Sequence, residues 1–478
     1  MAQAGPDSTA GSASAPDAND PGLLSTGDVG LLIDQYELTM GASYLARGMN
    51  EPAVFELSAR RLPERRQWLL VAGLGPTLNL IRSLRFGARE LEYLAGLGFD
   101  DRFLRYLHDF RFSGDIDAMP EGMVAFANEP LLRVAAPLIE AQLLETLLLN
   151  QINFQTTLAT KAARILLAAG GGRPGAGGRV VDFSARRDHG TDAAMKAARC
   201  AVIAGADGTS NVAAAMRYGV TPVGTMAHSY VMSFASERES FRAFLEDFPG
   251  HAVLLVDTYD TLGGVRNAIA ASLETGVPLA GIRLDSGDLL DLARGARALL
   301  DDAGMTATQI VASGNLDEHR IGALVGHGAP IDVWGVGTDL GTSRDAPVLD
   351  GVYKLVAEMS GDRWRGVAKR SPGKATVPGA KQVYRRYADG RMVGDVIAMV
   401  DEPQPGDLLL APVVRAGHLV HEESLAELRE RAASQLSAIP ERLLALDPDE
   451  GVTPYPVEWS ERLRTAGGGR TSGARVGV

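Results

Sequence analysis

Short runs of β-branched residues alternate with amphipathic segments in the middle of the chain, from Arg179 to about Thr338. This alternation predicts strands at Val180–Ser184, Ala252–Asp257, Ala280–Leu284, Gln309–Ala312 and Asp332–Val336, with weaker signals near Ala204 and Pro222. Helical periodicity lies between them, in Asp192–Ile203, Leu262–Leu273, Leu289–Asp302 and Leu316–Val325. Strand-then-helix units in series specify a parallel sheet, and about seven of them predict a closed or nearly closed barrel. A doubly wound open sheet is the alternative.

The segments on either side of this region have a different pattern. Residues 28 to about 145 mix helical stretches with isolated strands, namely Leu38–Arg47, Leu91–Gly96 and Asp101–Leu107, then Ala53–Leu57, Val124–Ala127 and Leu131–Ala135. Residues 350 to about 425 are mostly strand-like, as in Val352–Ala357, Val383–Tyr387 and Leu408–Val414. Because neither segment has an obvious complete core, we expect both to fold together as one discontinuous α/β domain beside the barrel.

These patterns predict a division of the chain into four parts. Residues 23–145 plus 348–463 form the discontinuous α/β domain, and residues 146–347 form the α/β barrel. Residues 1–22 are rich in Ala, Ser, Gly, Pro and Asp, and residues 464–478 are rich in Gly, Arg and Ser. Both ends lack the apolar surface that offsets the entropy of ordering, so we expect a disordered and a flexible tail.

Composition narrows the class of protein. The 478 residues are 46% hydrophobic and 22% charged, as in globular domains, and 47 Lys and Arg against 59 Asp and Glu give a net charge of −12. That acidity argues against a nucleic-acid partner, which needs a basic face. The longest apolar run, Leu143–Leu149, is far shorter than the roughly 20 residues of a membrane span. The single Cys200 excludes intramolecular disulfides and Cys-rich zinc sites, and favours a cytoplasmic location.

Polar and charged residues follow each predicted barrel strand. In chain order the clusters are Arg186–Gly190, Asp207–Asn211, Gly224–Ser229, Asp257–Asp260, Arg283–Asp288, Ser313–Asp317 and Gly335–Asp339. Barrel enzymes place their active sites at the carboxyl ends of the strands, so these clusters predict a site there. Helix capping alone could explain Asp317 or Thr258, but it does not explain the recurrence of Arg, His and Gly.

Two of these clusters indicate anion binding. Ser313-Gly314-Asn315 and Gly335-Val336-Gly337-Thr338 place small residues at strand ends, where backbone N–H groups can approach a phosphate; tight turns are the alternative. Arg283 and Asp285 are two apart on one strand and therefore face the same side. The arginine could hold a carboxylate, and the aspartate could bind ribose hydroxyls or Mg²⁺. A structural Arg–Asp ion pair remains the alternative.

Histidine supplies the candidate base or nucleophile. His228 follows a strand in a turn of small residues, where an exposed imidazole could take a proton or attack phosphorus. A packed, hydrogen-bonded structural histidine is the competing interpretation. His189, beside Arg186 and Arg187, is a second candidate.

The order of these motifs closely resembles that of the nicotinate phosphoribosyltransferase family of NAD salvage. Beyond the strand-end clusters, the resemblance includes Asp34–Met40, Phe55–Leu57, Asn150–Thr156 and Val352–Val356, and it runs from about Asp34 to about Val414. It implies a type II phosphoribosyltransferase fold, with an irregular α/β barrel and an α/β domain built from both chain ends. This fold agrees with the one that the patterns predict.

The resemblance implies an ATP-coupled, ligase-type enzyme. It would join nicotinate to phosphoribosyl pyrophosphate, giving nicotinate mononucleotide and pyrophosphate, with ATP hydrolysis coupled through a transient phosphohistidine. Mg²⁺ would be the cofactor, and a homodimer with shared active sites would be the assembly.

The resemblance also implies roles for individual residues. His228 would be phosphorylated, and Tyr36, Thr225 and Arg283 would hold nicotinate, with Tyr36 (among residues 34–40) stacking on the pyridine ring across a dimer interface. The remaining implied contacts, to the phosphoribosyl group, are Arg186, Ser313, Gly314, Gly337, Thr338 and Asp285, with Asp285 also a catalytic carboxylate and Mg²⁺ ligand. Two positions depart from the family pattern: Ile33 replaces a common Thr, and Asp188 adds a charge where small residues are usual.

Two other functions stay open at this stage. Within the same fold, the chain could be a nicotinamide or quinolinate phosphoribosyltransferase, which differ in the charge of the pocket. From another class, a non-catalytic phosphoribosyl or nucleotide sensor would keep the glycine turns without needing His228.

Overall fold

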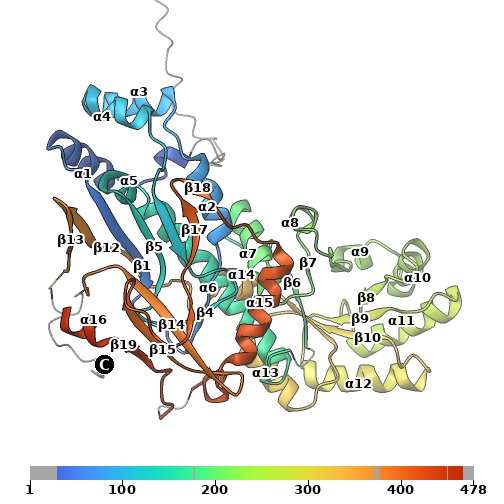
Figure 1. Cartoon of the computed structure of the whole chain (residues 1–478). Helices are drawn as coiled ribbons and strands as arrows, with labels where there is room; N and C mark the ends of the chain where they lie inside the picture. Colours follow the sequence, from blue (N-terminus) through green and yellow to red (C-terminus); the bar gives the residue numbers. More distant parts are fainter. Residues whose placement is uncertain (1–28, 176–177, 370, 372–375, 449–450, 467–478) are drawn as a thin grey trace, which may run out of the picture.

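The computed structural model describes residues 29–175, 178–369, 371, 376–448 and 451–466 (Figure 1). The predicted N-terminal tail, residues 1–22, lies outside these ranges. The predicted C-terminal tail begins too early, because residues 464–466 belong to helix α16 (Glu461–Ala466); its remaining residues are not described. Within the described residues, no helix is long and apolar enough to cross a membrane.

A six-stranded parallel sheet forms the middle of the chain. Its strands are β6 (Arg179–Asp182), β7 (Gly208–Thr209), β8 (Val253–Leu255), β9 (Gly281–Leu284), β10 (Gln309–Ala312) and β11 (Val333–Val336). The strand order is β7-β6-β11-β10-β9-β8. The first strand of the chain segment, β6, pairs with its last strand, β11, so the strands follow one another around a ring that is open between β7 and β8. The sheet is therefore a half-barrel, which confirms the predicted fold class and excludes a doubly wound sheet.

Two details of the strand prediction were wrong. The weak signal near Ala204 belongs to the end of helix α7 (Thr191–Ala204), and β7 begins four residues later at Gly208. The signal near Pro222 is a single bridge to Thr209 and not a seventh strand. The absence of a full strand here leaves the ring open beside β7.

Helices connect the strands of the half-barrel. They are α7, α8 (Val212–Tyr218), α9 (His228–Met232), α10 (Glu237–Asp247), α11 (Thr261–Thr275), α12 (Leu289–Asp302), α13 (Glu318–Gly326) and α14 (Thr338–Thr342). Several begin at polar residues whose side chains cap the first turn: Asn211, Ser236, Asp260, Asp288 and Asp317. The alternative interpretation, that Asp317 and Thr258 are helix caps, is therefore confirmed for Asp317. It is wrong for Thr258, because Asp260 caps the helix that follows.

A seven-stranded antiparallel sheet combines both ends of the chain. Its order is β13 (Arg363–Gly366), β12 (Gly351–Ser360), β1 (Pro52–Ala59), β5 (Pro130–Pro137), β3 (Asp115–Ala118), β17 (Ala411–Arg415) and β18 (His418–Leu419). Around it lie α1 (Gln35–Ala46), α2 (Leu74–Ser83), α3 (Ala88–Gly96), α4 (Asp101–His108) and α5 (Leu138–Gln142) (Figure 1). The central strands β1 and β12 come from opposite ends of the chain, so neither end could complete this sheet alone.

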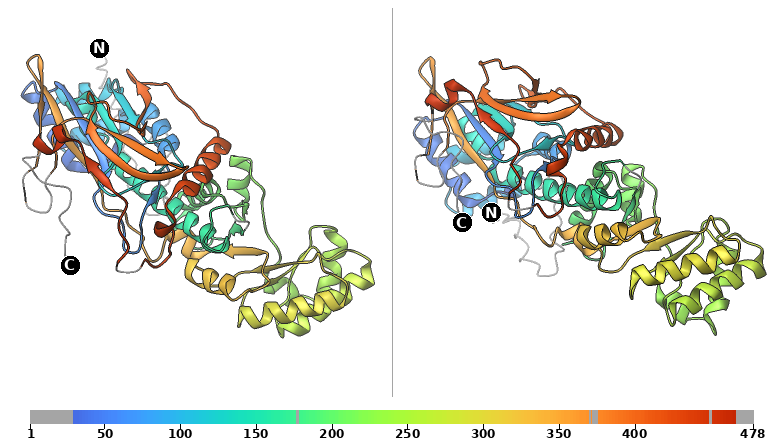
Figure 2. Two further views of the ribbon diagram at one scale, coloured as in Figure 1. Left: turned by 60° about the horizontal axis from the view of Figure 1, so that its bottom comes forward. Right: turned by 90° about the horizontal axis from the view of Figure 1, so that it is seen from below.

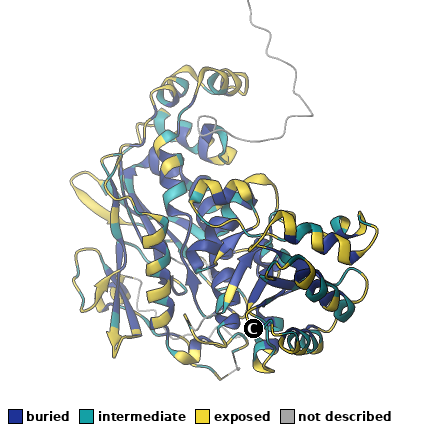
Figure 3. Cartoon of the chain, turned by 90° about the vertical axis from the view of Figure 1, so that its right-hand side faces the viewer, coloured by how far each residue is buried: buried dark blue, intermediate teal, exposed yellow. Residues whose placement is uncertain are grey.

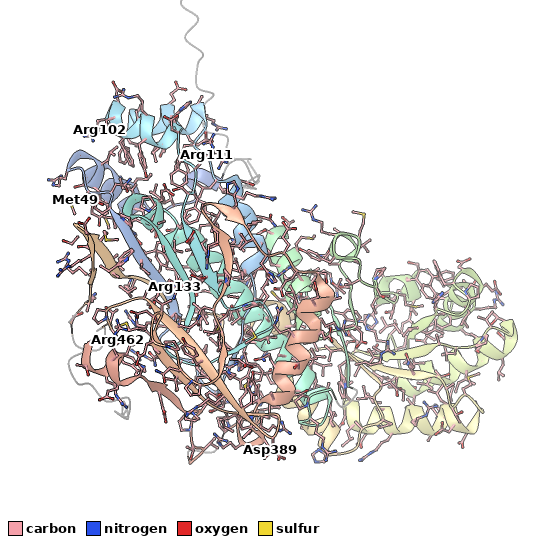
Figure 4. All side chains as sticks on the ribbon, in the orientation of Figure 1. Met49, Arg102, Arg111, Arg133, Asp389 and Arg462 are labelled. Carbon is pink, nitrogen blue, oxygen red and sulfur yellow. The ribbon has the colours of Figure 1, made fainter. Side chains whose placement is uncertain are left out.

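A second sheet, which is mixed, packs beside the first; two of its strand pairs are antiparallel and one is parallel. It contains β16 (Asp407–Leu408), β14 (Lys381–Ala388), β15 (Arg391–Met399) and β19 (Val457–Trp459), and a small ribbon pairs β2 (Leu69–Leu70) with β4 (Val124–Ala125). Arg133 of β5 joins the two larger sheets by donating to Asp117 at 2.7 Å and to the carbonyl of Lys381 (Figure 4). The predicted strand over Leu408–Val414 is in fact two strands, β16 and β17, which belong to different sheets.

Helix α6 (Glu145–Ala169) connects the half-barrel to the antiparallel sheets. It contacts α7, α13 and α14 on one side and α2, β2 and β12 on the other, and most of its residues are buried. Helix α15 (Leu425–Ala438) packs on α7 and returns the C-terminal segment to the half-barrel. Helices α10 to α12 project to the far end from α1 (Figure 2), while the buried residues follow the strands and α6 (Figure 3).

Candidate active site

The Arg283 side chain joins three loops at the carboxyl edge of the half-barrel. Its Nε donates to Ser313 Oγ at 2.8 Å, one terminal nitrogen donates to Thr225 Oγ1 at 3.0 Å, and the other to Asp285 Oδ1 at 2.8 Å. Ser313 Oγ also donates to Asp285. Thus Arg283, Asp285, Thr225 and Ser313 lie together, as the strand-end clusters predict, and Arg283 and Asp285 share one side of β9.

Two carboxylates lie next to this arginine. Burial raises the pKa of Asp285, but hydrogen bonds from Arg283 and Ser313 outweigh it and hold the pKa below its ordinary value. Asp285 is therefore ionised at neutral pH. Asp257, at the end of β8, accepts hydrogen bonds from the Asp285 N–H and from Ser286 through Oδ2, whereas its buried Oδ1 has no hydrogen-bond partner among the described residues. An orphaned carboxylate oxygen beside a second carboxylate is a place where a cation fits.

Close backbone contacts shape the loops after β10 and β11. Gly314 has φ +85°, and a Cβ there would lie 1.9 Å from the Asp285 carbonyl oxygen, so the position requires glycine. Gly337 precedes α14, whose first residue is Thr338. The two loops thus lie beside Asp285 and Phe183 respectively, because a Cβ on Gly337 would be 3.2 Å from the Phe183 carbonyl oxygen.

The Phe183 ring packs against the guanidinium group of Arg283. The Arg283 guanidinium carbon lies 5.6 Å from the centre of the Phe183 ring, and a Cβ at Gly335 would be 2.6 Å from that ring. A cation over an aromatic face, in a half-buried position, suits a flat anionic ligand. The sequence analysis assigned no role to Phe183 or Asp257. Phe183 lies near the end of one predicted strand and Asp257 ends another, and this position at a strand end was the signal that could have identified them.

His228 is the first residue of α9 and is half-buried. Its Nδ1 lies 3.2 Å from Thr258 Oγ1, in the loop after β8. Asp285 is close enough for the histidine to influence its charge, since a charged His228 would lower the pKa of Asp285. The contact with Thr258 orients the ring, and it leaves Nε2 as the nitrogen available for chemistry.

The turn between β6 and α7 carries three exposed candidate residues. Arg186, Arg187 and His189 are exposed there, and they take no part in the hydrogen bonds of Arg283. Asp188, the departure noted above, accepts from Ser184 Oγ at 3.0 Å and contacts α14, where a Cβ on Gly341 would be 1.7 Å from its Oδ1. Its carboxylate therefore packs the turn against α14.

Tyr36 lies apart from these residues within one chain. It belongs to α1, at the opposite end of the molecule from α9 (Figures 1 and 2), and 45% of its surface is exposed. It lines a cavity of about 360 Å³ together with Glu145 and other residues: Asp34, Thr146, Leu149, Asn150, Asn153, Phe154, Thr157, Pro347, Val348 and Leu349. Burial and the carboxylates of Glu145 and Glu37 raise the pKa of Tyr36, so its hydroxyl stays protonated.

The fold and this edge of the half-barrel define an α/β half-barrel protein with a cluster of polar and charged side chains around Arg283 at the carboxyl ends of its strands. Two family models match the chain: the nicotinate phosphoribosyltransferase N-terminal domain over residues 31–153 and the nicotinate phosphoribosyltransferase family over residues 179–376. The chain therefore belongs to the nicotinate phosphoribosyltransferase family, as its motifs predict.

Similar proteins support this assignment. The chain is 47% identical over 438 residues to nicotinate phosphoribosyltransferase pncB2 of Mycobacterium tuberculosis, covering 91% of this chain and 92% of that protein. It is 43% identical to nicotinate phosphoribosyltransferase of Bacillus subtilis, over 77% of this chain and 76% of that protein. The crystal structure of human nicotinic acid phosphoribosyltransferase has a TM-score of 0.77 at 29% identity, covering 91% of this chain and 99% of that one.

The close approach at Gly314 predicts a large effect of Gly314→Ala. The added methyl group would push the loop away from β9 and move Ser313 off Arg283 and Asp285. A displacement of about 1 Å at such a site lowers kcat/KM by roughly 100-fold. Steady-state kinetics should show this loss, whereas Gly326→Ala, where a Cβ meets nothing within 4 Å, should act like wild type. Equal activity of the two variants would contradict this view of the loop.

The raised pKa of Glu37 predicts that the stability of the fold depends on pH. Burial raises its pKa to about 7, although hydrogen bonds from Thr146 oppose the shift. Because the native carboxyl binds its proton more tightly than the unfolded one, this group destabilises the fold as pH rises toward and above 7. Glu37→Gln keeps an oxygen acceptor without the charge. Its Tm should exceed that of wild type more at pH 8 than at pH 5, while the exposed Glu92→Gln should show no such difference. A gain independent of pH would reject this explanation.

Proposed function

We propose that the protein joins nicotinate to phosphoribosyl pyrophosphate, giving nicotinate mononucleotide and pyrophosphate, with ATP hydrolysis coupled through a phosphohistidine. The observation that carries this proposal is Arg283, held by Thr225 and Ser313 above the Phe183 ring and beside the ionised Asp285. A cytoplasmic location, in which the buried Cys200 stays reduced, belongs to the same proposal.

The pocket chemistry favours nicotinate over its relatives. A carboxylate can accept from the two N–H groups of Arg283 that make none of its three side-chain hydrogen bonds, while the pyridine ring lies beside Phe183. A neutral nicotinamide would leave this guanidinium without an anionic partner other than Asp285. Quinolinate carries a second carboxylate, which would meet the negative charges of Asp285 and Asp257.

The phosphoribosyl group would lie over the loops after β10 and β11. Gly314, Gly337 and Thr338 offer little side-chain bulk and their backbone N–H groups to phosphate oxygens. Ser313 would act by orienting this loop, because its own N–H donates to the Leu284 carbonyl and its hydroxyl donates to Asp285. The exposed Arg186 could add a further anion contact from the neighbouring turn.

Mg²⁺ fits the carboxylates beside this site. Among the described residues no group of three or more His, Cys, Asp or Glu could hold a metal ion by itself. Asp285 and Asp257, with its orphaned Oδ1, could hold Mg²⁺ jointly with substrate phosphates, which is how proteins commonly bind it. When bound, Mg²⁺ would neutralise charge on the departing pyrophosphate.

The bond exchange places distinct demands on these residues. The pyridine nitrogen forms a bond to the ribose anomeric carbon as the bond from that carbon to pyrophosphate breaks. Positive charge develops on the ribose in the transition state, so the ionised Asp285 stabilises it. Arg283 and Phe183 orient the ring so that its nitrogen faces the anomeric carbon.

His228 would couple ATP to this exchange. Its Nε2 would attack the γ-phosphorus, forming a P–N bond as ADP leaves, and water would later hydrolyse that bond to release phosphate. The contact between Nδ1 and Thr258 supports this role, because it orients the ring with Nε2 free. A phosphorylated His228 would favour the state that binds the substrates more tightly.

A homodimer would complete the site. Tyr36 is exposed and lines a cavity that includes none of the residues bonded to Arg283, so a second copy could bring its own Tyr36 to the pyridine ring. Apolar residues also project near the half-barrel opening, with Val212 and Met216 of α8 exposed by 69% and 83%. Such residues favour contact with another protein surface.

The direct test is conversion of labelled nicotinate by the purified protein. With phosphoribosyl pyrophosphate and Mg²⁺ we expect nicotinate mononucleotide, formed faster when ATP is added. The same assay with nicotinamide or quinolinate should give turnover at least about 100-fold slower. Nicotinamide has no carboxylate to pair with Arg283, and the second carboxylate of quinolinate is repelled by Asp285 and Asp257. Comparable turnover of either would reject the choice of nicotinate. Binding of phosphoribosyl pyrophosphate without pyrophosphate release would favour the sensor instead.

The phosphohistidine role is tested at His228. In His228→Asn we expect neither stimulation by ATP nor a label from γ-phosphate-labelled ATP, since the nucleophilic nitrogen is gone. His251→Asn, an exposed position elsewhere, is the matched control and should keep both. Retained stimulation and equal labelling in His228→Asn would overturn the assignment, and His189 would be tested next.

A further inference from the structure

A buried group of charged side chains lies outside the candidate active site. We call Arg66, Lys161, Arg164, Glu318 and Asp345 the Lys161 cluster. The side chains of Arg66, Lys161, Arg164 and Glu318 are at most 3% exposed, and that of Asp345 is 34% exposed. Three cations therefore meet two carboxylates in the interior, between α6 and the half-barrel.

Lys161 is the centre of this cluster. Its ammonium donates to Glu318 Oε2 and, at 2.8 Å, to Asp345 Oδ1. Arg164, one turn further along α6, donates to Glu318 Oε1 at 3.1 Å. Arg66, from the loop between β1 and β2, lies 2.8 Å from Asp345 Oδ2. Each carboxylate thus binds Lys161 and a second cation.

The two carboxylates lie just beyond the two loops proposed to hold the phosphoribosyl group. Glu318 is the first residue of α13, directly after the Ser313–Asp317 segment. Asp345 follows α14, which begins at Thr338. The ammonium of Lys161 therefore joins the start of α13, which follows the loop after β10, to the segment after α14, which follows the loop after β11. Because α6 is 25 residues long and packs on both α13 and α14, Lys161 is attached to a rigid support.

The energetics point away from a purely stabilising role. Burying charged side chains carries a large desolvation penalty, and well-packed apolar side chains often serve stability as well or better. The charges nonetheless fix one arrangement. Burial raises the pKa of both Glu318 and Asp345, but Lys161 outweighs it, and both carboxylates stay ionised. An ionic cluster of this kind selects a single spacing of the elements that it joins.

We propose that Lys161 is a positioning residue that sets the separation of the loops after β10 and β11, and thereby the affinity for phosphoribosyl pyrophosphate. This inference rests on the proposed function, which assigns those two loops to that substrate. Lys161 acts through Glu318 and Asp345 and does not touch the substrate. Nicotinate, held by Arg283 and Thr225, is bound by other groups and should not depend on it.

The test uses Asp345→Asn, because Asp345 is the least buried member and asparagine has nearly the same shape. We expect the KM for phosphoribosyl pyrophosphate to rise about tenfold, while kcat and the KM for nicotinate change less than about twofold. Asp447→Asn is the matched control. Asp447 pairs with Arg65 and His319 on the surface and is not part of the Lys161 cluster, so both KM values should stay unchanged.

A binding measurement tests the same role of Lys161 without catalytic turnover. The rise in Tm that phosphoribosyl pyrophosphate with Mg²⁺ causes in wild type should be smaller in Asp345→Asn and normal in Asp447→Asn. Lys161→Met combined with Asp345→Asn should raise the KM no further than Lys161→Met alone, since both act through one contact.

The inference is overturned if Asp345→Asn lowers Tm but leaves both KM values and the ligand-induced shift unchanged, or if it raises both KM values equally. Either result would make the cluster structural only. Absence of phosphoribosyl transfer by wild type is a separate outcome. It would reject the proposed function, while the ligand-induced Tm shift would still report on the two loops.

Discussion

Parallel strands that end at one edge are the constraint on which the rest of this structure depends. Because β9 and β10 are neighbours, the segments that follow them meet at their carboxyl ends, and Arg283 bonds to both Asp285 and Ser313. Arg283 also reaches Thr225, which follows β7 on the other side of the opening in the ring. A guanidinium held by three acceptors has little freedom left to lose, so it presents its charge to a ligand in a fixed orientation.

Local charge in this protein opposes its overall charge. The chain carries −12, yet nicotinate, phosphoribosyl pyrophosphate and ATP are all anions, so long-range electrostatics repel the proposed substrates weakly. Attraction has to arise at short range. Arg283 supplies it at the edge of the half-barrel, and the Lys161 cluster adds one net buried positive charge behind the loops after β10 and β11. Asp285 and Asp257 then provide the negative charge that a cation needs.

Much of the fold could be predicted because its signals are local. Buried parallel strands favour apolar runs, and Ile310–Ala312 is such a run within the predicted strand Gln309–Ala312, whose bounds match β10. The errors arose where pairing decides the outcome. Leu408–Val414 is apolar throughout but divides between two sheets, and the segment near Pro222 makes one bridge instead of a strand. Thr258 resembled a cap, although its hydroxyl contacts His228 from another loop.

The sequence by itself determined the strand and helix order, the strand-end clusters and the family, because these depend on periodicity and on motifs a few residues long. It also placed Arg283 and Asp285 on one side of a strand. Only the tertiary structure decided that the Arg283 guanidinium lies over the Phe183 ring, that Asp257 joins Asp285, and that Lys161 binds both Glu318 and Asp345. Those relations join residues that are 28 to 184 positions apart or come from different elements, and no local pattern encodes such contacts.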